Sequence, residues 1–130
     1  MFFHAAHVAL SESFPTDTVV SVHGFLDNGV SISNGTKSSP AADSFQIKLV
    51  DTLVRVFPDE KITTCQQYPG APYGRRMCGG ENVQGRHING SANACTQNAE
   101  SSSARFIHIE QSRAVRNQRD LVIQAFREAL

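Results

Sequence analysis

The stretch RFIHIEQSRAVR, residues 105–116, constrains the fold most strongly because it changes from one kind of secondary structure to another. Its first half alternates large apolar residues with polar ones, which is typical of a β-strand. Its second half continues into a pattern with helical spacing. A strand that passes directly into a helix indicates a domain in which strands and helices pack in layers.

Three further segments have the composition of β-strands. The run TDTVVSVHGF places three valines shortly before His23 and Gly24. Such near-continuous apolar character predicts a central strand that is covered on both faces. Shorter strands are predicted at VSIS, residues 30–33, and within EKITTCQQ, residues 60–67.

Apolar residues recur at helical spacing in three places. Residues 2–13 form a short amphipathic pattern before Pro15. A second helix is predicted to begin with Ser39 as its cap and Pro40 at its first position, and to end at Pro58. Its apolar stripe comprises Phe45, Leu49, Leu53 and Phe57. The chain closes with a third helix, whose stripe comprises Val115, Val122, Phe126 and Ala129.

The order of these elements predicts the architecture. A chain of 130 residues suits a single domain with one core. We expect an α/β domain over residues 1–130, with a small, mostly parallel or mixed sheet flanked by helices in three layers. Residues 67–104 hold six of the nine glycines. So long an irregular segment within a compact domain is usually functional or mobile.

Charge and hydropathy exclude several kinds of partner. Twelve basic and twelve acidic residues give a formal net charge of zero, so no electrostatic argument supports nucleic acid or an anionic membrane as a partner. No apolar run approaches the roughly 20 residues of a membrane-spanning helix. The first ten residues lack a basic leader and an evident cleavage site. We therefore expect a soluble protein, and the sequence gives no basis for claiming an export signal.

The three cysteines, Cys65, Cys78 and Cys95, are an odd number without the close spacing of a zinc knuckle. Their pattern does not indicate a disulfide scaffold. One bridge is compatible with an oxidising compartment, and the pair that we favour is Cys78 with Cys95. Such a bridge would indicate an exported origin.

His23 and Glu110 are the candidate chemical groups. Both stand at the carboxyl ends of predicted strands, where functional groups gather in parallel α/β sheets. An imidazole and a carboxylate that meet there suit metal-assisted hydrolysis, with His23 as the ligand and Glu110 as the base. The alternative is structural: a strand-end histidine caps backbone groups, and an acid in the first turn of a helix complements its dipole.

Three motifs, VVSVHGF, VQGRHINGS and RFIHIEQSRAVR, together resemble the C-terminal portion of the N-formylglutamate amidohydrolase-like zinc hydrolases, relatives of the zinc carboxypeptidase fold. The resemblance extends over about residues 18–116. It implies a phosphorylase/hydrolase-like fold. It also implies that His23 is a zinc ligand and Glu110 the catalytic carboxylate. The family supplies its other zinc ligands from an earlier segment, which this chain lacks, so we expect a truncated form of the domain. His4 and His7 could substitute for the missing zinc ligands. Their place in an apolar helix favours helix-surface histidines instead.

Arginines near the site are candidates for binding a substrate carboxylate. Arg113 follows Glu110 by one helical turn, and Arg86 lies in the glycine-rich loop. Solvent exposure is the structural alternative for Arg113. His108 shares a strand face with Glu110, and either orients the carboxylate or is simply a satisfied histidine.

The expected function is metal-dependent, hydrolase-like cleavage of an amide in an N-acyl amino acid or small peptide, with zinc as the cofactor. The small-molecule substrate would carry a carboxylate. The alternative is a noncatalytic binding module that keeps the fold but lacks a complete metal site. Such a module would suit a homodimer, formed through surface that the missing half would have covered.

Overall fold

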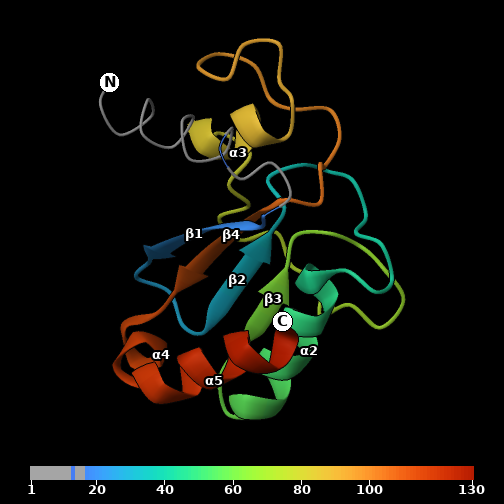
Figure 1. Ribbon diagram of the computed structural model, residues 1–130. Helices are drawn as coiled ribbons and strands as arrows, with labels where there is room; N and C mark the ends of the chain where they lie inside the picture. The colour runs from blue at the N-terminus through green and yellow to red at the C-terminus, as the bar shows by residue number, and fades with distance from the viewer. Residues whose placement is uncertain (1–12, 14–16) are drawn as a thin grey trace.

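The structure is a computed structural model that describes Ser13 and residues 17–130. The helix expected at residues 2–13 lies outside the described residues, apart from Ser13. Figure 1 shows the strands and helices in chain order: β1 (Val19–Gly24), β2 (Val30–Ser33), α2 (Phe45–Val56), β3 (Ile62–Thr64), α3 (Val83–Ile88), β4 (Phe106–Gln111), α4 (Arg113–Asn117) and α5 (Arg119–Ala129).

The four strands form one mixed sheet in the order β1-β4-β2-β3. β1 pairs with β4 in parallel, and β2 pairs with β3 in parallel, whereas β2 and β4 are antiparallel. α2 and α5 pack against each other on one side of the sheet, and α3 lies on the other side (Figure 1). The predicted small α/β fold with flanking helices is confirmed.

One face of the sheet is apolar and forms the core. Because side chains alternate between the faces of a strand, Ile107 and Ile109 point to this face together with Val30 and Ile32. All four are almost fully buried, and Leu53 of α2 packs with them. The remaining residues of the cluster are Leu49, Val50, Phe57, Ile62, Val115, Ala125 and Ala129.

The opposite face is predominantly polar. The pairing register places on it side chains of all four strands, which we call the polar face: Ser21, His23, Ser31, Ser33, Thr63, His108 and Glu110. Phe106 shares this face, and Gly85 of α3 lies so close that a Cβ there would be 2.4 Å from the Phe106 ring. Loops and α3 cover the polar face, whereas helices α2 and α5 cover the apolar one (Figure 1).

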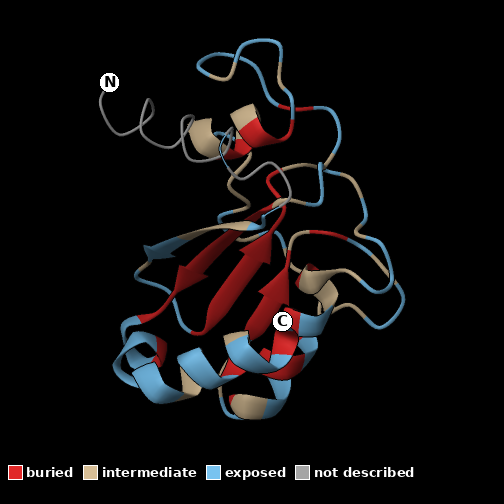
Figure 2. Ribbon diagram, in the orientation of Figure 1, coloured by how far each residue is buried: buried red, intermediate tan, exposed pale blue. Residues whose placement is uncertain are grey.

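The prediction that the valine-rich strand is central was wrong. β1 is an edge strand of the described sheet, and its last three residues are exposed. Figure 2 shows the contrast with the buried strands β2, β3 and β4. Val20 packs against the core, but Val22 remains 53% exposed. The valines therefore reflect the general preference of β-branched residues for strands and not burial on both faces.

Two helix boundaries also differ from the prediction. α2 does not begin at Ser39 and Pro40, since Ser44 is its cap and accepts a hydrogen bond from the Ile47 N–H. Ser39 instead donates to the Gln67 carbonyl. The predicted C-terminal helix is divided at Gln118 into α4 and α5, although its apolar stripe packs on the core as expected.

The glycine-rich segment is irregular apart from α3 and an isolated bridge between Thr64 and Tyr73. The expected Cys78–Cys95 bridge was wrong: Cys65 pairs with Cys78, and Cys95 is free and exposed. Cys65 directly follows β3, and its bond with Cys78 closes the loop between them. The spacing of the cysteines in the sequence does not identify this pair. In the part of the chain that the structure describes, no helix has the length and apolar character to cross a membrane.

Candidate functional site

His23 and Glu110 lie on neighbouring strands, at the strand ends where the sequence predicts them. β1 and β4 are parallel, and these two residues are direct partners in the register. Paired residues of a parallel ladder project to the same face, so both side chains belong to the polar face. They differ in burial, because His23 is exposed at the sheet edge whereas Glu110 is only 5% exposed.

His108 holds the Glu110 carboxylate. Its Nε2 lies 3.2 Å from Glu110 Oε1, and both side chains are buried. The rings of His108 and His23 have centroids 4.9 Å apart. The structure therefore brings two imidazoles and one carboxylate together on the polar face.

Burial sets the protonation of this pair. It raises the pKa of Glu110 above its usual value, and the nearby His23 only partly opposes the shift. Burial, together with the proximity of His23, lowers the pKa of His108 to about 4. Near neutral pH the His108 ring is therefore uncharged, and in its Nε2–H tautomer it donates to the carboxylate.

Two atoms of the pair have no hydrogen-bond partner among the described residues. They are Glu110 Oε2 and His108 Nδ1, both buried. In a neutral His108 that donates through Nε2, Nδ1 is an acceptor, and so is the carboxylate oxygen. Buried polar atoms are rarely left unpaired, so these two acceptors of the pair remain able to take a hydrogen bond from a further donor.

His23 belongs to a second hydrogen-bonded chain. Asn82 Nδ2 lies 3.3 Å from Ser21 Oγ, which in turn lies 2.8 Å from His23 Nε2. If the amide donates to the hydroxyl, the hydroxyl hydrogen points to His23 and assigns the Nδ1–H tautomer. Asn82 also caps α3 by accepting from the Gly85 N–H. This residue thus ties the loop segment to β1.

A cavity of about 950 Å³ opens over this group of side chains. His23, His108 and Glu110 line it, together with loop residues from three parts of the chain. Its charged loop side chains are Lys37, Arg75, Glu81 and Glu100. A volume of this size accommodates a small organic ligand.

The structure does not bring the two predicted substrate-binding arginines to this cavity. Arg86 donates to the Gly80 carbonyl and the Asn98 side chain, and so stabilises the loop. Arg113 is exposed at the start of α4 and does not line the cavity. Lys37 and Arg75 are the cationic side chains that do line it. They lie in irregular loops, where no periodic pattern marks them.

The described residues do not complete a metal site. No group of three or more histidine, cysteine, aspartate or glutamate side chains among them is arranged to hold a metal ion. A catalytic zinc ion normally has three protein ligands. His23 has its Nε2 turned to Ser21, and Glu110 Oε1 lies beside His108. These residues by themselves do not fit the expected zinc ion, and His4 and His7 lie outside the described residues.

Comparison with known proteins finds no matching family model, no matching curated protein and no matching solved structure. The resemblance over residues 18–116 stays a prediction. The chemistry of the site is therefore argued from the cavity and from the side chains that line it.

Proposed function

We propose that this domain is hydrolase-like and cleaves an amide of a small N-acyl amino acid or peptide, with Glu110 as the general base. One observation carries the proposal: a buried carboxylate, with a raised pKa and a neutral imidazole beside it, lines a cavity of ligand size. Buried acids with shifted pKa values in a cavity are typical of acid–base sites.

Glu110 would act on a water molecule held at its unpaired oxygen, Oε2. As the water oxygen attacks the amide carbon, the carboxylate takes the water proton. The protonated carboxyl then gives that proton to the leaving nitrogen as the carbon–nitrogen bond breaks. His108 holds the other oxygen, Oε1, and so fixes the direction of Oε2. The products are a carboxylic acid and an amine.

Lys37 and Arg75 replace Arg86 and Arg113 in the proposal as the groups that attract the substrate carboxylate. Both line the cavity, and neither has an ion pair with another described residue. A guanidinium can bind a carboxylate through two parallel hydrogen bonds, whereas a lysine acts as a point charge. A substrate with an amide and a carboxylate would thus have both ends recognised.

Zinc, the cofactor that the resemblance implies, keeps a limited place in this proposal. His23 is the one residue that we would assign as a ligand, and Glu110 is reserved for the base. Because one protein ligand does not make a catalytic zinc site, no step above depends on the metal. A zinc ion, if bound, would polarise the amide carbonyl and acidify the attacking water.

Hydrolysis assays test the proposal directly. N-formylglutamate and a small panel of N-acyl amino acids are incubated with the protein, and amine release is followed. Glu110→Gln keeps the shape of the side chain but removes the base, so the rate should fall by about 100-fold or more. Glu60→Gln, outside the cavity, is the matched control and should retain the parent rate. A Glu110→Gln variant as active as the parent would remove Glu110 from the mechanism.

A noncatalytic binding module is the second candidate. The described residues do not supply a complete set of metal ligands, which favours a binding module. The hydrolysis assay separates the two candidates, and calorimetric titration with zinc, repeated with His23→Ala, tests the role of the metal. Zinc binding that His23→Ala abolishes supports the metallohydrolase, whereas no binding by the parent removes zinc from the proposal. Sedimentation analysis of the same samples tests the expected homodimer.

A further inference from the structure

The disulfide lies at the functional site. Cys65 follows the end of β3, and its partner Cys78 is the residue before Gly79. Both cysteines line the cavity, as do Tyr73 and Arg75 between them. We call residues 65–79 the covering loop, since they form one wall of the cavity over the polar face.

Gly79 brings the covering loop into contact with His108. Its φ is +65°, a conformation that favours glycine. A Cβ at this position would lie 2.5 Å from Cγ of the His108 ring, closer than a real Cβ approaches another atom. The main chain at Gly79 therefore rests directly against the imidazole that holds Glu110. Any larger residue here would displace the ring.

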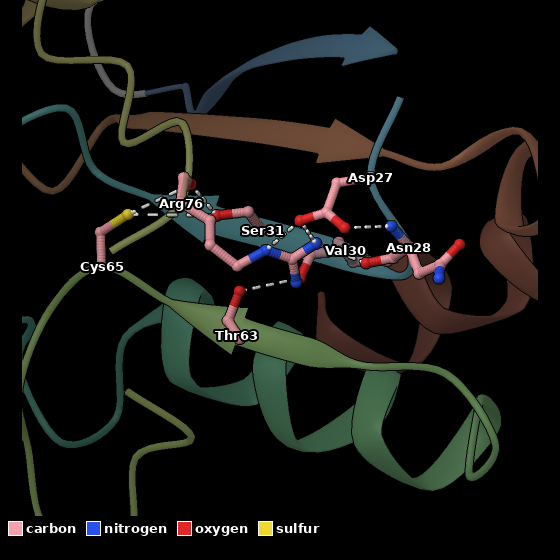
Figure 3. Close-up of polar contacts among 7 residues, drawn as sticks. All are labelled: Asp27, Asn28, Val30, Ser31, Thr63, Cys65 and Arg76. Carbon is pink, nitrogen blue, oxygen red and sulfur yellow. Dashed lines mark hydrogen bonds and ion pairs between the residues drawn. The ribbon is translucent and has the colours of Figure 1, made fainter. Parts of the chain in front are cut away.

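A second anchor holds the covering loop at Arg76, three residues before Gly79. Figure 3 shows the Arg76 side chain reaching Asp27, with Nε and Nη2 at 3.0 and 2.8 Å from Oδ2. The Arg76 guanidinium also lies 5.0 Å from the centre of the Phe25 ring. Ser31 Oγ donates to the Arg76 carbonyl. These contacts attach the loop to β2 and to the turn before it, but they do not reach His108.

We propose that the Cys65–Cys78 disulfide and Gly79 position the His108 imidazole against Glu110, so that reduction of the disulfide releases this contact. The covering loop has two separate attachments. Arg76 holds the covering loop three residues before Gly79, whereas the disulfide joins the residue next to Gly79 to the end of β3. Gly79 is then a positioning residue for the proposed general base and acts through His108. Only this consequence for catalysis rests on the proposed function.

The redox step needs an external reductant. A dithiol supplies two electrons and two protons, the S–S bond breaks to give the Cys65 and Cys78 thiols, and the dithiol closes to its own disulfide. Cys65 and Cys78 line an open cavity, so a small reductant has access to them. The free thiols no longer tie Gly79 to the end of β3.

Nuclear magnetic resonance tests the positioning without any substrate. In the oxidised protein, a nuclear Overhauser effect should connect the Gly79 Hα protons with the His108 ring. Addition of a dithiol, or the double substitution Cys65→Ser with Cys78→Ser, should abolish it. Cys95→Ser removes the free, exposed cysteine and should leave it intact. Persistence of the signal in the reduced protein, with unchanged His108 ring shifts, would overturn the role of the disulfide.

A pair of glycine substitutions tests Gly79 even if the double serine variant fails to fold. Gly70 has φ +79°, and no atom lies within 4 Å of the place that a Cβ would take there, so Gly70→Ala has the backbone strain without the clash. Gly79→Ala has both. We expect Gly79→Ala, but not Gly70→Ala, to shift the His108 ring signals. In Gly79→Ala, kcat should fall by a larger factor than KM changes. Equal His108 spectra for the two variants would contradict the proposal.

Discussion

The two faces of the sheet are covered in different ways. Apolar side chains of α2 and α5 pack on one face and leave a continuous core. Loops cover the other face, which keeps a cavity. Among the described residues, the buried side-chain atoms without a hydrogen-bond partner belong to the polar face or the covering loop: Tyr68 Oη, Arg76 Nη1, His108 Nδ1 and Glu110 Oε2. One face thus forms the apolar core, and the other keeps polar side chains beside a cavity.

Truncation in the core should have the largest effect on stability. Leu53 is 1% exposed and packs between α2 and the sheet. Leu53→Ala should lower the free energy of unfolding by about 2–5 kcal/mol, because it leaves a cavity among packed side chains. Urea denaturation measures the change. Val54→Ala, on the exposed side of the same helix, is the control and should have a much smaller effect.

Loss of the disulfide should have the second-largest effect on the free energy of unfolding. The bond joins residues separated by 13 positions, and its removal frees the unfolded chain. The double substitution Cys65→Ser with Cys78→Ser should lower the free energy of unfolding by about 2–4 kcal/mol. Thermal and urea unfolding of this variant and of Cys95→Ser provide the comparison. Equal stability of the two would show that the disulfide contributes nothing to the stability of the fold.

The polar face should make stability depend on pH, with a smaller effect. The pKa of His108 is about 4 in the folded protein and 6.5 as a free group. The unfolded chain therefore binds more protons between these values, and stability falls as pH falls through this window. The slope for His108 alone approaches about 1.4 kcal/mol per pH unit. Glu110, whose pKa is raised, acts in the opposite direction above pH 4.5 and reduces the net slope.

Substitution of His108 isolates this contribution. His108→Gln retains a hydrogen-bond donor but cannot titrate in this range. Urea denaturation at pH 7, 6 and 5 should give a smaller loss of stability for the variant than for the parent. Identical slopes would mean that another group determines the acid sensitivity.

The sequence predicts the strands, and the places of His23 and Glu110 at strand ends, because these depend on short-range patterns. Alternation within FIHIE places His108 and Glu110 on one face, and each strand end is marked by polar residues. The edge position of β1 depends on which strand pairs with β4, and no local pattern encodes that choice. The same holds for the helix cap, since Ser39 and Ser44 are both good caps and a tertiary contact to Gln67 occupies Ser39.

The covering loop illustrates what local patterns miss. The Cys65–Cys78 bond depends on the position of the loop relative to β3, and the role of Gly79 depends on a contact with His108, 29 positions along the chain. Lys37 and Arg75 likewise reach the cavity through irregular backbone. Arg86 satisfies loop acceptors, although its type and place in the sequence suggested a ligand contact.

Titration of the Glu110 carboxyl tests the central claim most directly, that the polar face holds a buried carboxylate suited to act as a base. Carbon-13 labelling of glutamate, with Glu110→Gln to assign the signal, allows its pKa to be followed by nuclear magnetic resonance. We predict a midpoint above the ordinary value of 4.5, because burial disfavours the charged form. A midpoint at or below 4.5 would contradict the account.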